Sequence, residues 1–135
     1  ILNYPPDSLI YICSTDFEIK KAFSIAGKDM DMDYREIKRH EEEVNIWNTE
    51  ITEKGYYSWI EYFDKQDLLF RSYTKGSHSK FDGLQIYKGD TMIGDVDVPK
   101  NFRVEGYIEP FFYSNEFIDE EKEEIKVYKF KLELR

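Results

Sequence analysis

Three short groups of side chains in this sequence have residue types that could do chemistry. The first is the alternating series Asp29, Asp31 and Asp33, which begins like a calcium loop in which carboxylates converge on one cation. Such a loop needs glycine at its sixth position and a bidentate glutamate at its twelfth, where this chain has Tyr34 and His40. The pattern therefore predicts no calcium site, and two histidines in the whole chain predict no other metal site.

The other two groups surround His78 and Glu61. His78 lies between Ser77 and Ser79 with Asp82 close by, but neighbours in one polar loop rarely hold the geometry of a nucleophile, a base and an acid. Glu61 interrupts an aromatic run, where a buried carboxylate would need a partner. Since the chain also has no glycine-rich phosphate loop, we predict that the protein is not an enzyme and has no cofactor.

Charge is the strongest indication of a partner. The chain has 28 acidic and 19 basic residues, a formal net charge of -9, which repels nucleic acids and attracts a basic protein. Acidic runs and exposed tyrosines are suited to such an interface. The residues predicted to bind the partner are Glu41, Glu42, Glu43, Tyr56, Tyr62, Asp119, Glu120 and Glu121.

These features predict an acidic protein-binding module that neutralises a basic partner. An immunity or inhibitor protein of a bacterial toxin, such as a nuclease toxin, fits best, because carboxylates can take the place of phosphates in a cationic active site. This interpretation rests on charge and size alone. The alternatives are a calycin-like barrel that binds a small ligand and an extracytoplasmic lipoprotein domain. A plainer hypothesis is that the acidity only keeps the protein soluble.

Length and composition predict one globular domain over residues 1–135. Aromatic residues make up 17% of the 135 residues, so the chain can bury enough apolar surface to fold. The single cysteine, Cys13, allows no intrachain disulfide, and no apolar run approaches the roughly 20 residues that span a bilayer. We expect a cytoplasmic protein without a membrane span. The chain begins with Ile1, so a secreted or lipid-anchored protein that lost a signal is the alternative.

The expected fold class is α+β, mostly antiparallel β: a sandwich or small barrel of seven or eight strands with one or two short helices near the N-terminus. A capping box at Thr15–Glu18 and a stripe of apolar residues predict a helix over 15–26, and 28–43 is a second short helix or an irregular charged segment. Alternation predicts strands at 8–13, 44–51, 56–63, 68–73, 84–87, 91–98, 102–108 and 125–134, with a short aromatic run at 111–113 and an acidic loop or helical turn over 115–124.

The same alternation predicts which side chains share a face. Bulges are expected at Gly94 and near 127–128. In the segment 95–98, valines facing the core predict aspartates that face solvent. In the strand over 56–63, strict alternation places Tyr57, Trp59 and Phe63 on one face and Tyr56, Ile60 and Tyr62 on the other.

Overall fold

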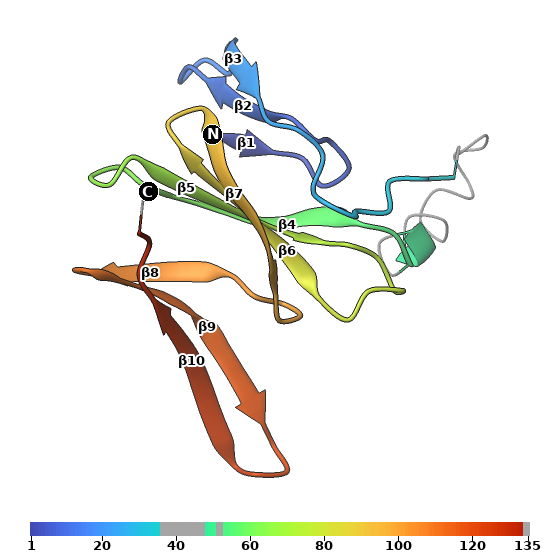
Figure 1. Cartoon of the computed structure of the whole chain (residues 1–135). Coiled ribbons are helices and arrows are strands. Elements are labelled where there is room, and N and C mark those ends of the chain that lie inside the picture. The colour runs from blue at the N-terminus through green and yellow to red at the C-terminus, as the bar shows by residue number, and fades with distance from the viewer. Residues whose placement is uncertain (36–47, 51–52, 134–135) are drawn as a thin grey trace.

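The computed structural model describes residues 1–35, 48–50 and 53–133, which form three antiparallel sheets stacked in layers (Figure 1). Sheet A consists of β1 (Leu2–Asn3), β2 (Ile10–Cys13) and β3 (Ile19–Phe23). Sheet B, the middle layer, consists of β4 (Tyr56–Phe63), β5 (Leu68–Thr74), β6 (Asp82–Lys88) and β7 (Thr91–Val98). Sheet C consists of β8 (Val104–Ile108), β9 (Phe111–Asp119) and β10 (Glu124–Phe130), in the order β10-β9-β8. The mostly antiparallel, sandwich-like prediction is confirmed, and in the described residues the three sheets form no closed barrel.

The helix predicted over 15–26 is wrong, because these residues form a β-hairpin. The Ser14 N–H donates to the Glu18 carbonyl at 2.9 Å, and Phe17 adopts a positive φ of 61°, so the expected capping box is a turn. β3 then pairs antiparallel with β2, and the Phe23 ring packs edge-on against Tyr87 of sheet B. Cross-strand pairing and one aromatic contact outweigh the local helical pattern, which had only four apolar positions.

The predictions for 28–51 fall largely outside the described residues. Residues 28–35 contain no helix. A strand was expected over 44–51, of which the structure describes residues 48–50. These residues are helical, as is residue 53, and the strand prediction is therefore wrong at 48–50. The Lys54 N–H donates to the Glu50 carbonyl at 2.7 Å, which is the spacing of a helical turn.

The strands of sheets B and C agree more closely with the alternation pattern. β4 and β7 have the expected bounds. The pairing of β7 with β6 shifts next to Gly94, where Ile93 is the extra residue of a bulge. The irregularity expected near 127–128 is a register shift between Val127 and Lys129, where the extra residue belongs to β9. The segment over 115–124 differs from expectation, because β9 continues to Asp119 and only the tip of the hairpin is a turn.

A bulge in β4 changes which of its side chains share a face. The pairing shifts between Tyr57 and Trp59, so Ser58 is an extra residue and the alternation changes phase. Tyr57, Ile60 and Tyr62 therefore face sheet A, which corrects the faces predicted from strict alternation. The other face, toward sheet C, carries Tyr56, Ser58, Trp59 and Phe63.

Sheets B and C are held together by an aromatic core. The Phe70 ring of β5 lies 4.9 Å from Phe112 of β9, and Phe112 stacks on Phe130 of β10 at 5.7 Å. Val104 and Phe102 complete this core close to β8. Offset and edge-on ring pairs of this kind add to the stabilisation from burial alone.

Sheets A and B meet through a buried polar layer centred on Arg71. The Arg71 side chain is 0% exposed, and its guanidinium carbon lies 3.4 Å from the centre of the Tyr57 ring. Burial lowers the pKa of Arg71 to about 10. Its N–H groups donate to the Asn3 side chain, to the Ser24 hydroxyl and to the carbonyls of Asp7, Ser8 and Leu9. One side chain on β5 therefore holds the N-terminal segment onto sheet B.

Gly83 and Gly27 leave room for the Tyr73 ring in this layer. A Cβ at position 83 would lie 1.9 Å from a ring carbon of Tyr73, and one at position 27 would lie 2.5 Å from the ring. We expect Gly83→Ala to lower the free energy of unfolding by about 1–3 kcal/mol, because the buried ring must move. Urea denaturation measures the change, with Gly106→Ala as the control, because the added Cβ would lie 4.0 Å from its nearest neighbour, the Tyr113 Cβ. A loss below 0.5 kcal/mol for Gly83→Ala would contradict this packing.

Candidate protein-binding surface

The aspartates of the calcium-like series diverge. The Asp31 carboxylate lies 3.2 Å from the Lys54 ammonium, whereas the Asp29 carboxylate lies 3.9 Å from Lys75. The described part of the chain has no group of three histidine, cysteine or acidic side chains that could hold a metal ion. These carboxylates therefore join the N-terminal segment to sheet B.

The residues around His78 do not form a catalytic set. Asp82 is buried and accepts hydrogen bonds from the Lys100 ammonium at 3.0 Å and from the Asn101 N–H at 2.7 Å. The Ser79 hydroxyl donates to the Phe81 carbonyl, and His78 is exposed. Glu61, the third candidate acid, is half-buried on β4.

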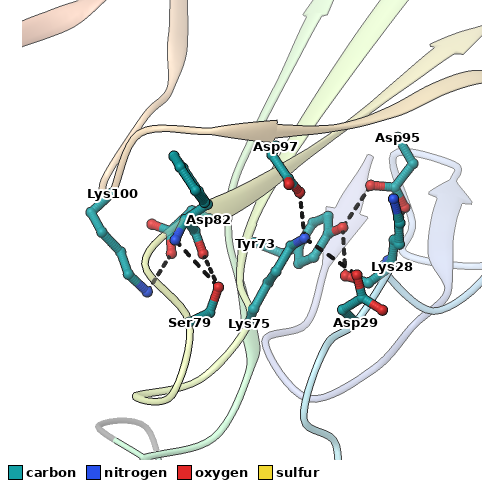
Figure 2. A network of polar contacts seen from close by, with 10 residues as sticks. Lys28, Asp29, Tyr73, Lys75, Ser79, Asp82, Asp95, Asp97 and Lys100 are labelled. Atoms are coloured by element: carbon teal, nitrogen blue, oxygen red, sulfur yellow. Dashed lines mark hydrogen bonds and ion pairs between the residues drawn. The ribbon is translucent and has the colours of Figure 1, made fainter.

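Figure 2 shows a polar network that involves both aspartates of β7, of which Asp97 is exposed as expected and Asp95 is half-buried. The Tyr73 hydroxyl donates to Asp95 at 2.6 Å, and the Lys28 backbone N–H donates to the same carboxylate at 3.0 Å. The Lys75 ammonium binds Asp97. Burial raises the pKa of Tyr73 well above its usual value, and the hydrogen bond to Asp95 is the second largest cause. Both aspartates therefore serve folding.

Acid should weaken this network in a predictable direction. The hydrogen bond from Lys75 lowers the pKa of Asp97 below its ordinary value of 3.8. Since the folded-state pKa lies below the unfolded one, the ionised form stabilises the protein above about pH 4, and this contribution is lost as the pH falls through the lowered pKa. We expect the urea midpoint to fall less between pH 6 and pH 3 in Asp97→Asn than in the wild type. An equal fall in both proteins would contradict the assignment.

Ion pairs hold only part of the acidic side chains in the rest of the molecule, since Asp16, Asp33, Glu53, Glu61 and Asp64 have none within the described residues. Ion pairs within the described residues join Glu18 to Lys20, Asp31 to Lys54, Asp82 to Lys100, Asp90 to Lys21, Asp97 to Lys75 and Glu105 to Arg103. The β9–β10 hairpin is distinguished by how many acids it has close together, because five of its residues 119–124 are acidic. Its lysines pair with Asp119 and Glu124, but no ion pair within the described residues holds Glu116, Glu120, Glu121 or Glu123. Negative charge is therefore dense at the tip of this hairpin, which projects from sheet C (Figure 1).

One face of this hairpin is also apolar and exposed. Ile118 and Ile125 lie directly opposite each other in the register, and Val127 lies opposite Glu116. The exposed fractions of Ile118, Ile125 and Val127 are 67%, 73% and 50%. We call these four residues and the tip acids the hairpin patch: Glu116, Ile118, Asp119, Glu120, Glu121, Glu123, Glu124, Ile125 and Val127. An apolar centre with a charged rim is the usual composition of a protein interface.

The structure places the predicted partner-binding residues in different parts of the molecule. Asp119, Glu120 and Glu121 lie together in the hairpin patch. Tyr56 lines a polar groove between sheets B and C, whereas Tyr62 lies at the other end of β4, on the face toward sheet A, and its hydroxyl donates to Asp67. Glu41, Glu42 and Glu43 lie outside the described residues. Ile118, Ile125 and Val127 complete the patch and were not predicted.

Comparisons with protein-family models, with curated proteins and with solved structures gave no match. The functional argument therefore depends on the surface itself. In the described residues, no helix has the length and apolar character needed to cross a membrane.

Proposed function

We propose that this protein is a binding module that neutralises a basic protein partner through the hairpin patch. The observation that carries the proposal is the coincidence, on one projecting hairpin, of three exposed aliphatic side chains with glutamates that have no ion pair within the described residues. The partner class that fits best is a toxin with a cationic, phosphate-binding active site, such as a nuclease. The protein would then act as its immunity or inhibitor protein.

The hairpin patch offers two successive kinds of interaction. The carboxylates at positions 120, 121 and 123 create a local negative potential that speeds the approach of a basic surface. Once the surfaces meet, Ile118 and Ile125 can be buried, and each fully buried aliphatic side chain contributes about 1.5–3 kcal/mol. Glutamates that reach into the active site would compete with the phosphates of the substrate.

Calorimetric titration of the whole protein against a panel of basic nuclease domains tests this proposal. We expect saturable 1:1 binding to at least one domain, together with inhibition of its nuclease activity. The binding should weaken as salt rises, because exposed charges are screened over about 10 Å at 0.1 M salt. Absence of heat across the panel, or binding without inhibition, would contradict the proposed function.

A second candidate function, the carriage of a small apolar ligand, is favoured by one observation. Where sheets B and C separate, between β7 and β10, there is an apolar groove of about 320 Å³. Val96, Phe102 and Tyr128 are among the residues that line it. Its volume is within the range of ligand pockets, although it is open on one side. Binding of a fluorescent fatty acid, and its loss in Val96→Asp, would favour this alternative.

A further inference from the structure

The strand β10 differs from every other edge strand of the three sheets. The strand orders place β1, β3, β4, β7, β8 and β10 at sheet edges. β1 has only two residues, and a bulge interrupts each of β3, β4, β7 and β8, where the extra residues are Lys20, Ser58, Ile93 and Glu105. The extra residue at the β9–β10 register shift belongs to β9, so β10 runs regularly over seven residues. Short strands and bulges oppose edge-to-edge pairing, and β10 is the one edge in the described part of the chain that has neither.

The main chain of β10 presents free groups on its outer side. The Tyr128 N–H donates to the Ser114 hydroxyl of β9 at 2.9 Å, so the main-chain groups of Tyr128 point toward β9. Because these groups alternate along a strand, those of Ile125, Val127 and Lys129 point away from β9. Within the described residues, no hydrogen bond from outside sheet C reaches these three main-chain positions, and residues 124–129 are exposed. This edge is therefore a template for one further strand.

The lysines of β10 do not block this edge. Lysine side chains are a common protection of edge strands against pairing. The Lys126 ammonium, however, lies 3.2 Å from the Glu124 carboxylate of its own strand, and the Lys129 ammonium lies 3.9 Å from the centre of the Phe111 ring on β9. Lys129 therefore places its charge over sheet C and leaves only its aliphatic stem at the edge.

We propose that β10 pairs antiparallel with β10 of a second copy of this chain, across a two-fold axis at Val127. Residues whose main-chain groups point outward must meet residues of the same kind. Val127 then lies opposite Val127 of the second copy, and Ile125 lies opposite Lys129. Each such pair exchanges both of its N–H to carbonyl hydrogen bonds, and the two copies of sheet C become one continuous sheet.

Charge complementarity favours a second copy as the occupant of this edge. In the proposed register Glu123 of one copy lies opposite Lys131 of the other, once at each end of the strand pair. No ion pair within the described residues holds either side chain. Lys126 lies opposite Tyr128, so no like charges face each other between positions 123 and 131. Opposite charges at facing positions stabilise a strand pair, and like charges would destabilise it.

The net charge of -9 does not prevent this pairing, because the acidic hairpin tips point in opposite directions. At about 3.3 Å per residue, the Glu121 residues of the two copies lie roughly 40 Å apart along the strand pair. This distance is several times the screening length of about 8 Å at physiological salt. The tips of the two hairpin patches therefore stay accessible at opposite ends of the dimer. The inference goes beyond the proposed function, and either can fail without the other.

Sedimentation velocity of the whole protein, without any partner protein, tests the proposal. A single strand pair makes a small interface, so the association is weak. We expect a monomer at about 5 µM and mainly dimer at about 500 µM. Amide hydrogen exchange of Ile125, Val127 and Lys129 should be about fivefold slower at the higher concentration, because these N–H groups are hydrogen-bonded only in the dimer.

Val127→Pro tests the role of the main chain. It removes an N–H that faces away from β9, so the pairing with β9 is retained and proline is tolerated at this edge. It should weaken dimerisation at least about tenfold. Ile118→Thr is the matched control, because it removes an exposed aliphatic side chain of the hairpin patch from β9, away from the edge. It should dimerise as the wild type does, and equal weakening in both variants would overturn the proposal.

A charge exchange tests the register and keeps the proposal testable if Val127→Pro does not fold. Glu123→Lys and Lys131→Glu should each weaken dimerisation at least about threefold, since each places like charges opposite each other at both ends of the strand pair. The variant with both changes should dimerise as the wild type does. A monomer at every concentration up to about 500 µM, or a double variant no stronger than the single ones, would overturn the proposal.

Discussion

Replacing Glu120 and Glu121 together with lysine is expected to slow association with a basic nuclease domain at least tenfold at low salt. The two changes reverse part of the negative potential at the tip of the hairpin, where no ion pair within the described residues compensates either glutamate. Electrostatic steering raises association rates by about 10 to 1,000-fold, so its reversal should act mainly on the association rate. Stopped-flow kinetics at several salt concentrations measure the effect.

The control for this variant reverses two acids elsewhere. Asp16→Lys with Glu18→Lys makes the same change in net charge at the β2–β3 turn, which is also an exposed hairpin tip. If the position of the charge matters, the control should slow association less than threefold. Equal slowing in both variants would mean that only the net charge of the protein steers the partner, and the hairpin patch would lose its role.

Arg71→Met is expected to reduce the free energy of unfolding by about 3–5 kcal/mol. Methionine fills a similar volume but cannot donate, so the carbonyls of Asp7, Ser8 and Leu9 lose their hydrogen bonds inside the protein. Such a loss is a large fraction of the roughly 5–15 kcal/mol that stabilises a typical domain. Urea denaturation measures it, and hydrogen exchange should show that β2 and β3 lose protection first.

Two further variants keep this prediction testable. Lys20→Met removes an exposed, ion-paired cation of β3 and should change the stability by less than 0.5 kcal/mol. Arg71→Lys retains a charge with fewer fixed donors and should fall between the wild type and Arg71→Met. A loss below 1 kcal/mol for Arg71→Met, with β2 and β3 as protected as in the wild type, would show that Arg71 does not hold sheet A.

Strand alternation predicted sheet B and most of sheet C because their strands have one or both faces buried. It could not locate the β4 bulge, because one serine in a strand is also compatible with regular alternation, and Tyr56 and Tyr62, which were predicted on one face, lie on opposite faces. In sheet A the strand predicted over 8–13 contains β2, whereas β3 was wrongly predicted as a helix for a different reason. Its hairpin is stabilised by contacts with Arg71 and Tyr87, which are distant in sequence, whereas the turn at Thr15–Glu18 resembles a helix start.

The hairpin patch was only partly predictable. The acids at 119–121 were recognised from charge, but their neighbours Ile118, Ile125 and Val127 were not. A signal for two of them was present, because Ile125 and Val127 are out of phase with the core-facing series that includes Phe130 and Leu132. Apolar residues out of phase with a core stripe point to solvent, and here they form the centre of the patch.

The most direct test of the account is a map of chemical-shift changes in the ¹⁵N-labelled protein when it is saturated with an unlabelled basic nuclease domain that it inhibits. The account predicts that the largest changes fall on residues 116–127 and that the amides of β2 and β3 hardly move. Changes concentrated on sheet A, on the polar groove or on the apolar groove, with residues 116–127 unaffected, would contradict it.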